Sequence, residues 1–267
     1  MATPEARLSF RRVGAHTVVE SALAQSPLRI LTPRNHGVAA WAYTSTLGGG
    51  LVDGDRIRMH VSVEPRAFAL LASQGHNRVY RCASESGSEL SARVAEGALL
   101  AVVPDPTVCF KGARYRQKTA IRIAPGGAAV LADVLAAGRE ARGERWVFDR
   151  YASELLVQCG NRVLLHETTL LDPRHGSLAG RLGRFDAIGT IVIAGERLRG
   201  ARSAIAREST SAPLGRRPDI VEQANDLGEA LHVRFAAASI EEAIRLIRTR
   251  LTFLPELLGD DPWARRA

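Results

Sequence analysis

The sequence predicts a mainly β fold with a few helices, one of which is amphipathic and lies near the C-terminus. Three patterns carry this prediction: apolar residues that alternate with polar ones, short apolar runs between turn residues, and one late segment with helical spacing. The chain has 267 residues, of which 46% are hydrophobic and 24% charged, so it can bury a core without disulfides or a structural metal. No shift in composition divides the chain, and we expect one domain over residues 1–267.

Three segments of the first half alternate with a period of two, which is typical of strands with one face in water. In residues 56–63, every second residue from Ile57 to Val63 is apolar, and the residues between them are Arg, His and Ser. Residues 90–94 and 114–123 show the same alternation more weakly. We therefore expect three half-buried strands here.

Short apolar runs predict further strands, buried inside a larger sheet system. These runs are residues 68–71, 99–103, 155–157, 163–165, 191–193 and 231–235. Turn residues rich in Gly, Pro, Asp and Asn separate the strands, at 48–50, 53–55, 104–106, 125–127, 160–161 and 172–173. Many short strands at this spacing favour a β-rich architecture.

The clearest helix is predicted to start at Ser239. Ser239 and Glu242 form a Ser-x-x-Glu capping box, in which each side chain accepts a backbone N–H at the helix start. Apolar residues then recur at intervals of three and four up to Leu254, and we expect this stripe to face the core rather than a partner. Arginines favour the end of the helix, and Pro255 is expected to stop it. A shorter helix is expected within residues 176–189.

Several enzyme classes are excluded by their motifs. Neither Lys111 nor Lys118 follows a glycine, so the chain lacks the Gly-Lys-Ser/Thr sequence of a P-loop. Neither the Gly-x-Gly-x-x-Gly of dinucleotide-binding folds nor the Gly-x-Ser-x-Gly of α/β-hydrolases occurs. Residues 166–170 begin like the His-Glu-x-x-His of zinc proteases but end in Leu170, and they lie in a strand-like run. We interpret them as structural.

The three cysteines, Cys82, Cys109 and Cys159, are widely spaced and form no Cys-x-x-Cys pair. The N-terminus is charged within its first five residues and has no apolar stretch typical of a signal peptide, so we expect a cytoplasmic protein without disulfides. No apolar run approaches the ~18 residues of a membrane span, and we expect no membrane partner. Cys82 and His76 could contact a metal, but a buried, inert thiol and a surface imidazole are the preferred interpretation.

Two pairs of carboxylates have both a functional and a structural interpretation. Asp53 and Asp55 would share one face of an extended backbone and could hold a divalent cation transiently. Their side chains could instead bond to nearby backbone in a Gly-Asp turn, which we favour. Glu140 and Glu144 lie among arginines, and we favour a salt-bridged turn over an acid–base pair.

The formal net charge is +8, and 34 of the 36 basic residues are arginines. Either the base composition of the coding sequence explains this, or the surface binds carboxylates or phosphates bidentately. Two alternative functions remain open: an arginine-rich nucleic-acid-binding β protein, and an unrecognised hydrolase that uses His16, His60 or His76 as a base. Aromatic residues make up only 5%, and neither a recognition motif nor a nucleophile–base spacing is present. We expect no nucleic-acid partner and no enzymatic activity.

Four segments, in this order, resemble signatures of the urease accessory protein UreD family, also called UreH. They are residues 48–55 (GGGLVDGD), 71–81 (LASQGHNRVYR), 104–117 (PDPTVCFKGARYRQ) and 138–146 (GREARGERW). The motif residues singled out in them are Gly49, Gly50, Gly54, Gln74, Tyr80, Arg81, Pro104, Pro106, Phe110, Gly138, Arg139, Gly143 and Glu144. Ser73 stands where the family usually has threonine, and Cys109 where it usually has proline. The second half matches poorly, so no partner contacts are carried over to it.

The resemblance implies stacked β-sheets with a β-helix-like course and few helices. It also implies a role in urease maturation: the chain would hold the urease apoprotein and, through UreF, the GTPase UreG, while nickel is inserted. The missing P-loop agrees with this role, since GTP hydrolysis must then come from another subunit. No catalytic residue and no tightly bound cofactor are expected, and Ni²⁺ would pass transiently.

A nickel path needs weak ligands in succession, such as carboxylates, hydroxyls, carbonyls and imidazoles. The candidates that cluster around the motifs are Asp53, Asp55, Glu64, His76 and Asp105. The alternative is that the motifs only serve β-turns, which need Gly and Pro at these positions.

Overall fold

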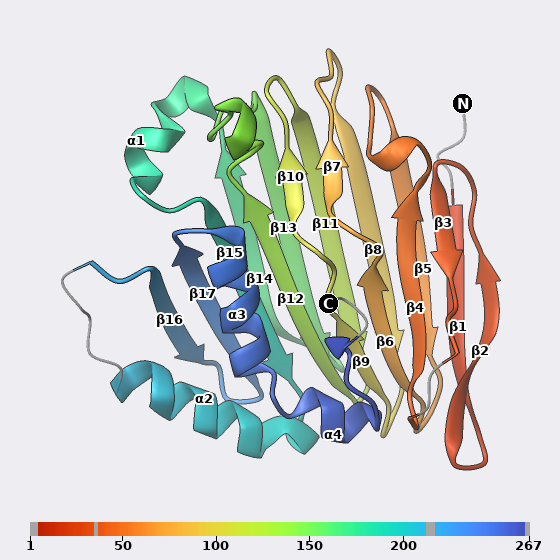
Figure 1. The fold of residues 1–267 in the computed structure, drawn as a ribbon. Helices are drawn as coiled ribbons and strands as arrows, with labels where there is room; N and C mark the ends of the chain where they lie inside the picture. Colours follow the sequence, from red (N-terminus) through yellow and green to blue (C-terminus); the bar gives the residue numbers. More distant parts are fainter. Residues whose placement is uncertain (1–4, 35–36, 212–216, 265–267) are drawn as a thin grey trace.

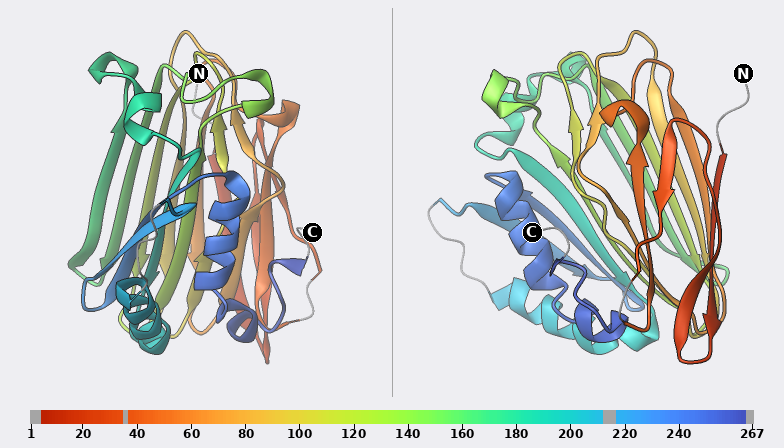
Figure 2. Two further views of the ribbon diagram at one scale, coloured as in Figure 1. Left: turned by 60° about the vertical axis from the view of Figure 1, so that its left-hand side comes forward. Right: turned by 45° about the vertical axis from the view of Figure 1, so that its right-hand side comes forward.

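The computed structural model describes residues 5–34, 37–211 and 217–264, which fold into two β-sheets and a layer of helices (Figure 1). The right-hand view of Figure 2 shows the three layers one behind another: helices, one sheet, then the other sheet. The prediction of a mainly β fold with a few helices is confirmed.

Sheet A has seven strands in the described residues. In spatial order they are β14 (Arg162–Leu171), β13 (Arg150–Cys159), β11 (Arg114–Ile123), β8 (Ser86–Val94), β5 (Arg56–Val63), β1 (Glu5–Val13) and β2 (His16–Leu23). The five strands from β13 to β1 pair in parallel. Antiparallel partners, β14 and β2, form the two edges.

Sheet B has ten strands in the described residues. Its main path is β16 (Ile220–Asp226), β17 (Ala230–Ala237), β15 (Ala187–Ala194), β12 (Ala128–Ala136), β9 (Leu99–Val102), β6 (Phe68–Ser73), β4 (Ala40–Thr46) and β3 (Leu28–Leu31). Two short strands extend it at one end, β7 (Asn77–Val79) and β10 (Thr107–Cys109). From β4 to β12 the main-path strands pair in parallel, whereas β15, β17 and β16 pair in antiparallel fashion.

The chain passes repeatedly from one sheet to the other between β4 and β13. Strands β5, β8, β11 and β13 lie in sheet A, and the strands between them in sequence lie in sheet B. Each parallel pair thus joins strands that are separated in sequence by a strand of the opposite sheet. The β-helix-like course that the family resemblance implies stays a prediction.

The period-two strand at residues 56–63 is confirmed as β5. Its apolar residues from Ile57 to Val63 are at most 7% exposed, while Arg56 and His60 face solvent. The strand expected at residues 163–165 is present as part of β14. The expectation that it is buried is wrong, because Val163 is 55% exposed. The reason is that β14 is an edge strand with only one neighbour.

Three helices cover the outer face of sheet B. They are α2 (Arg199–Ser211), α3 (Ile240–Arg250) and α4 (Leu254–Leu258), and they contact strands of that sheet from β16 to β6. The shorter helix expected within residues 176–189 is α1 (Leu178–Leu182). Four 3₁₀ turns complete the described helical segments: η1 (Leu47–Gly49), η2 (Glu140–Arg142), η3 (Pro173–His175) and η4 (Glu196–Leu198). No helix in the described part of the chain is long and apolar enough to cross a membrane.

Half of the predicted capping box is present in α3. The hydroxyl of Ser239 accepts the backbone N–H of Glu242 at 3.2 Å, but the Glu242 carboxylate pairs with Arg245. The expectation that Pro255 stops this helix is wrong, because α3 ends at Arg250 and Pro255 lies in the first turn of α4. Proline fits there because the first turn of a helix leaves its N–H groups unpaired.

β12 is buried on both faces and links two apolar layers. Its residues Ala129, Leu131 and Leu135 face the space between the sheets, whereas Val130 and Val134 face the helices. A strand covered on both sides needs no polar alternation, which explains its run of alanine, valine and leucine. Asp133 is the exception in this run, and it lies on the side that faces sheet A.

Candidate functional site

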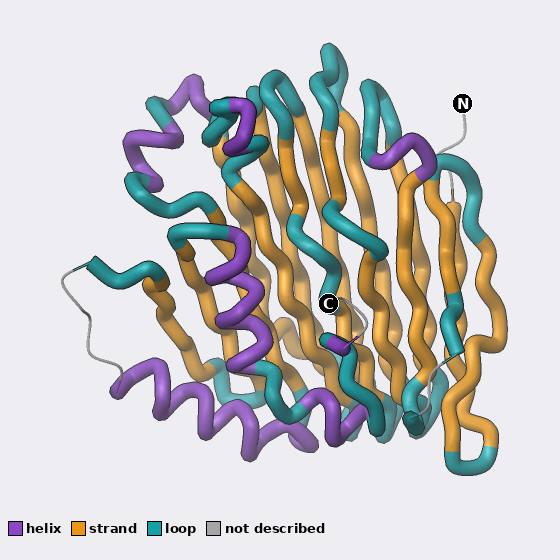
Figure 3. The backbone as a smooth tube through the Cα atoms, in the orientation of Figure 1, coloured by secondary structure: helices purple, strands orange, loops and turns teal. Residues whose placement is uncertain are grey.

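The four sequence motifs meet at one end of the two sheets, where many loops gather at the top of Figure 3. The first motif joins the second through a parallel bridge: Leu51 N–H donates to the Arg78 carbonyl at 2.8 Å, and Tyr80 N–H donates to the Leu51 carbonyl at 2.9 Å. A Cβ at Gly50 would lie 2.5 Å from the Arg78 carbonyl oxygen. Glycine is therefore required at residue 50 because the two backbones approach so closely.

The second motif joins the third. β7 and β10 pair in parallel, and Phe110 N–H donates to the Val79 carbonyl at 2.9 Å. Asp105 accepts the Ser73 hydroxyl at 3.1 Å and the Gly75 N–H at 3.0 Å. Ser73 thus supplies the hydroxyl that holds this turn, where threonine was expected from the family pattern.

The fourth motif closes onto the third. Arg139 pairs with Glu144 through two hydrogen bonds, one of them 2.9 Å long from Nε, and Glu144 also accepts the Lys111 N–H at 3.2 Å. The bond from Arg139 is the main reason why the pKa of Glu144 is lowered. The expected salt-bridged turn is therefore present. Glu140 has no part in the Arg139 pair, and its pKa is raised mainly by burial and secondly by Asp186.

Two cavities lie between the sheets and border this end. The first, of about 310 Å³, has Gln74, His76 and Asp105 among its lining residues. The second, of about 390 Å³, extends toward β14, β15 and β17. The two cavities share four lining residues: Gln117, Thr119, Leu131 and Asp133.

A polar bridge crosses between the sheets where the two cavities adjoin. Gln117 of β11 donates from Nε2 to the Asp133 carboxylate of β12 and to the Ser153 hydroxyl at 3.1 Å. Asp133 is half-buried, and its side chain borders both cavities. Burial raises the pKa of Asp133, with the bond from Gln117 as the main opposing effect. Ionisation of this carboxyl group is therefore less favourable than in water, and a nearby cation would favour it.

Hydroxyl groups continue the polar lining from this bridge into the first cavity. The Tyr115 hydroxyl lies 2.6 Å from the Ser88 hydroxyl and accepts the Asn77 amide at 3.2 Å. Burial raises the pKa of Tyr115 and also that of Tyr151, which lines the second cavity. Both phenols therefore stay neutral at physiological pH and offer oxygen atoms without charge.

A second charged cluster borders the far side of the second cavity. Glu167 accepts from Arg234 Nε at 3.1 Å and lies 3.1 Å from His232 Nε2, which is also 2.8 Å from the Thr190 hydroxyl. Burial opposes ionisation of Glu167, but the bond and charge of His232 and the charge of Arg234 outweigh it and lower the pKa. Glu167 is thus held as an ionised carboxylate.

The five candidate nickel ligands do not form one cluster. His76 and Asp105 both line the first cavity. Asp53 accepts the Ser84 N–H at 2.8 Å, and bonds from Ser84 lower the pKa of Asp53. Asp55 accepts the Val52 N–H at 2.9 Å.

The backbone around the remaining candidates explains their separation. Gly54 has a φ of +78°, so Asp53 and Asp55 flank a turn and not an extended segment, and the Gly-Asp turn interpretation fits. Glu64 follows the last residue of β5, at the opposite end of that strand from Asp55. In the described residues, no group of three or more His, Cys, Asp and Glu side chains is arranged to hold a metal ion.

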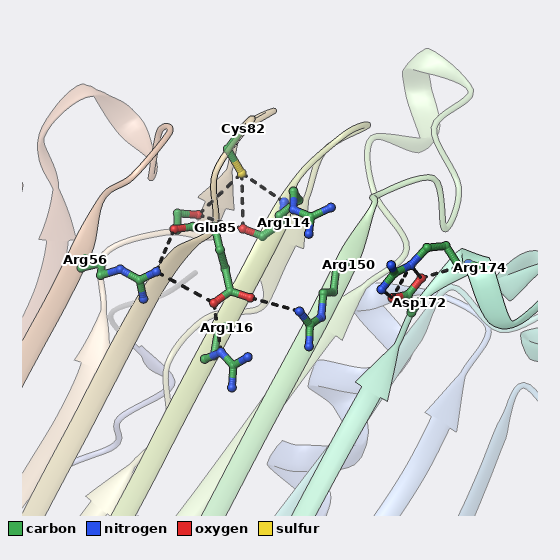
Figure 4. A network of polar contacts seen from close by, with 9 residues as sticks. Arg56, Cys82, Glu85, Arg114, Arg116, Arg150, Asp172 and Arg174 are labelled. Atoms are coloured by element: carbon green, nitrogen blue, oxygen red, sulfur yellow. Dashed lines mark hydrogen bonds and ion pairs between the residues drawn. The ribbon is translucent and has the colours of Figure 1, made fainter.

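The outer face of sheet A is exposed and carries charges that pair across strands. Figure 4 shows Glu85 among three arginines: Arg116 Nε lies 3.0 Å from its carboxylate, Arg150 3.7 Å and Arg56 4.0 Å. Farther along the strands, Arg58 pairs with Glu89 at 3.1 Å. The face therefore has an excess of positive charge around Glu85.

The same view shows that Cys82 has a structural role. Its sulfur accepts the Arg114 N–H at 3.1 Å, and the side chain is 5% exposed (Figure 4). His76 is exposed on the loop before β7. The preferred interpretation of a buried thiol and a surface imidazole is thus supported.

Sequence reasoning missed the residues of the interior bridge. Asp133 belongs to no motif, and the only available signal was a single carboxylate in a long apolar run. Glu167 was set aside with the incomplete His-Glu-x-x-His stretch. His232, in an apolar run near the C-terminus, gave no signal, because its partner Glu167 is far away in sequence.

Comparisons with known proteins agree with the motifs. The sequence model of the family described as "UreD urease accessory protein" matches residues 2–267. The chain is 46% identical over 260 residues to the urease accessory protein UreD of Sorangium cellulosum strain So ce56, covering 97% of this chain and 83% of the relative. It is 36% identical over 261 residues to UreD of Anaeromyxobacter sp. strain Fw109-5, covering 97% and 88%. It is 29% identical over 290 residues to the urease accessory protein D of Arabidopsis thaliana, covering 97% and 99%.

Proposed function

Because the chain belongs to the UreD urease accessory protein family, we propose that it is a non-enzymatic urease maturation factor. In this role it binds the urease apoprotein and recruits UreF and, through UreF, the GTPase UreG, so that nickel enters the urease active site. The observation that carries the proposal is the family match over residues 2–267. The missing P-loop supports it, since the nucleotide chemistry must come from a partner.

The interior of the protein offers a route for the nickel ion as cargo. The first cavity reaches the motif end, the second reaches the Glu167 cluster, and both border Asp133. Such a route leads from the motif end, between the sheets, to edge strand β14. His76 and Asp105 lie at its motif end, and they are the two sequence candidates that remain on the proposed route.

The ligands along this route are suited to brief binding. Carboxylate, amide and hydroxyl oxygens hold a borderline divalent cation more weakly than a closed set of thiolates or imidazoles would. The raised pKa of Asp133 adds to this weak binding, because a proton competes with the cation for the carboxylate. This competition lowers the affinity for the cation and favours its release.

The test is activation of urease in cells that express the urease structural genes, the other accessory proteins and variants of this chain. Asp133→Leu replaces the carboxylate by the side chain of its neighbours Leu131 and Leu135. We expect the variant to co-purify with urease subunits like the unmodified protein, while nickel per urease and specific activity fall at least fivefold at limiting nickel. Glu154→Gln, on the exposed face of sheet A, is the matched control. It should leave co-purification, nickel per urease and specific activity unchanged.

The two parts of the proposal fail separately. Full nickel loading with Asp133→Leu contradicts the interior route and leaves the scaffold role intact. Absence of urease subunits and UreF from purifications of the unmodified chain contradicts the scaffold role. Retention on heparin with a steep salt dependence, in place of co-purification, favours the nucleic-acid alternative.

A further inference from the structure

A third pocket lies on the outer side of sheet B, next to the motif end and separate from Asp133. Its volume is about 390 Å³, which falls within the range of small-molecule sites. Residues from the second, third and fourth motifs line it, together with Ile240 at the start of α3. The proposed nickel route does not use this pocket, although His76 and Arg78 border both it and the first cavity.

The lining of this pocket is strongly basic. It contains the three arginines Arg78, Arg139 and Arg142 and the imidazole of His76, and no Asp or Glu. Among the described residues, neither Arg78 nor Arg142 forms a side-chain ion pair or hydrogen bond, and both are exposed. Two arginines at the border of this pocket therefore have charge-assisted donors available to solvent or to a ligand.

The third arginine is fixed in place by its neighbours. The Arg139 guanidinium lies over the Phe110 ring, 4.2 Å from the ring centroid, and pairs with Glu144 on its other side. The Tyr80 ring meets Phe110 edge to face at 5.1 Å between centroids. The floor of the pocket is thus aromatic, partly buried and preformed, and Ile240 adds an aliphatic wall.

We propose that this pocket binds an oxyanion, a carboxylate or phosphate group, on a ligand whose apolar part packs against Phe110 and Ile240. Arg78 and Arg142 hold the oxyanion by charge-assisted hydrogen bonds, since an arginine fork matches both groups. The apolar floor selects ligands with a hydrophobic portion over simple ions. The inference concerns a second site and does not depend on the role in urease maturation.

The test uses the purified full chain and three small probes at constant ionic strength: benzoate, its neutral isostere benzamide, and phenyl phosphate. Binding is followed by NMR titration of backbone amides and arginine Nε–H signals. We expect benzoate to bind with a Kd of about 1–10 mM, as suits a small ligand in an open pocket, and benzamide at least tenfold more weakly. Shifts should concentrate at Tyr80, Phe110 and Arg142.

Variants locate the binding. Arg78→Gln and Arg142→Gln should each weaken binding of the anion about fivefold or more. Neither should change the melting temperature, because both side chains are exposed. Arg122→Gln, which removes an exposed arginine from the outer face of sheet A, is the charge-matched control and should leave the Kd unchanged.

Either anion can support the inference, and the tighter of the two identifies the oxyanion. Binding of benzoate better than phenyl phosphate assigns a carboxylate ligand, and the reverse assigns a phosphate ligand. Equal binding of benzoate and benzamide overturns the proposal. An equal loss of anion affinity in Arg122→Gln and Arg78→Gln also overturns it. So does the absence of measurable binding of either anion at 50 mM, roughly five times the upper limit of the expected Kd range.

Discussion

The layer between the two sheets and the layer between sheet B and the helices share one strand, yet they differ in polarity. β12 presents Val130, Ala132 and Val134 to the helices, and each is at most 3% exposed. On its other side it presents Asp133 between two leucines, beside two cavities. The helix-side layer is a continuous apolar core, whereas the layer between the sheets contains polar groups that bond to one another.

This difference in polarity follows from what packs against each face of β12. A buried polar group is tolerated only where a partner reaches it, and Gln117 reaches Asp133 from the opposite sheet. In the described part of the helix layer, the side chains that pack with the other face of β12 are apolar and offer no such partner. Both layers therefore bury apolar side chains, and the layer between the sheets also keeps space for polar groups.

The largest effect is expected from a polar side chain in the wrong layer. Val130→Asn leaves an amide without partners among aliphatic side chains, which costs about 3 kcal/mol, and the melting temperature falls by roughly 6–12 °C. Leu131→Asn, one residue along, borders both cavities, where water can solvate the amide, so its loss should be less than half as large. Calorimetry of both variants measures this, and equal losses contradict the difference between the layers.

A smaller effect of opposite sign is expected from Asp133→Asn. The raised pKa of Asp133 means that its ionised form is unfavourable in the folded state, so the penalty is absent below the unfolded pKa of ~3.9 and grows as pH rises above it. The variant should gain on the order of 1–2 kcal/mol of unfolding free energy at pH 8 and nothing near pH 4. Denaturant unfolding at several pH values tests this, and a gain that is independent of pH contradicts it.

The smallest effect is expected outside both layers. Glu89→Gln removes the ion pair with Arg58 on the exposed face of sheet A, where the two side chains are 45% and 40% exposed. The loss should be at most about 0.5 kcal/mol and should vanish in 1 M salt, because solvent and ions screen exposed pairs. A loss above 1 kcal/mol would show that this face is less solvated than the structure indicates.

The sequence predicted some strands well and others not at all, for a physical reason. β5 has one solvent-exposed face, so the alternation of apolar and polar residues is visible in its sequence. β12 is covered on both faces, and its alanine- and leucine-rich run has neither alternation nor strong strand preference. Burial on both sides depends on the helices and the opposite sheet, which are distant in sequence.

The candidate site was predictable in its motifs but not in its interior. The motifs around Gly50, Tyr80, Phe110 and Glu144 could be identified because each is a contiguous segment that resembles a signature of the family. The Gln117–Asp133 bridge could not, because it joins strands of different sheets. A hydrogen bond between sheets depends on the packing of the whole fold, so no local sequence pattern encodes it.

The repeated passage of the chain between the sheets also affects folding. Each parallel pair of sheet A joins strands with an intervening strand of sheet B, so most stabilising contacts connect distant parts of the sequence. High contact order of this kind slows folding to milliseconds or longer. The motif end requires residues from 48 to 146, so a nascent chain cannot complete this end before more than half of it has left the ribosome.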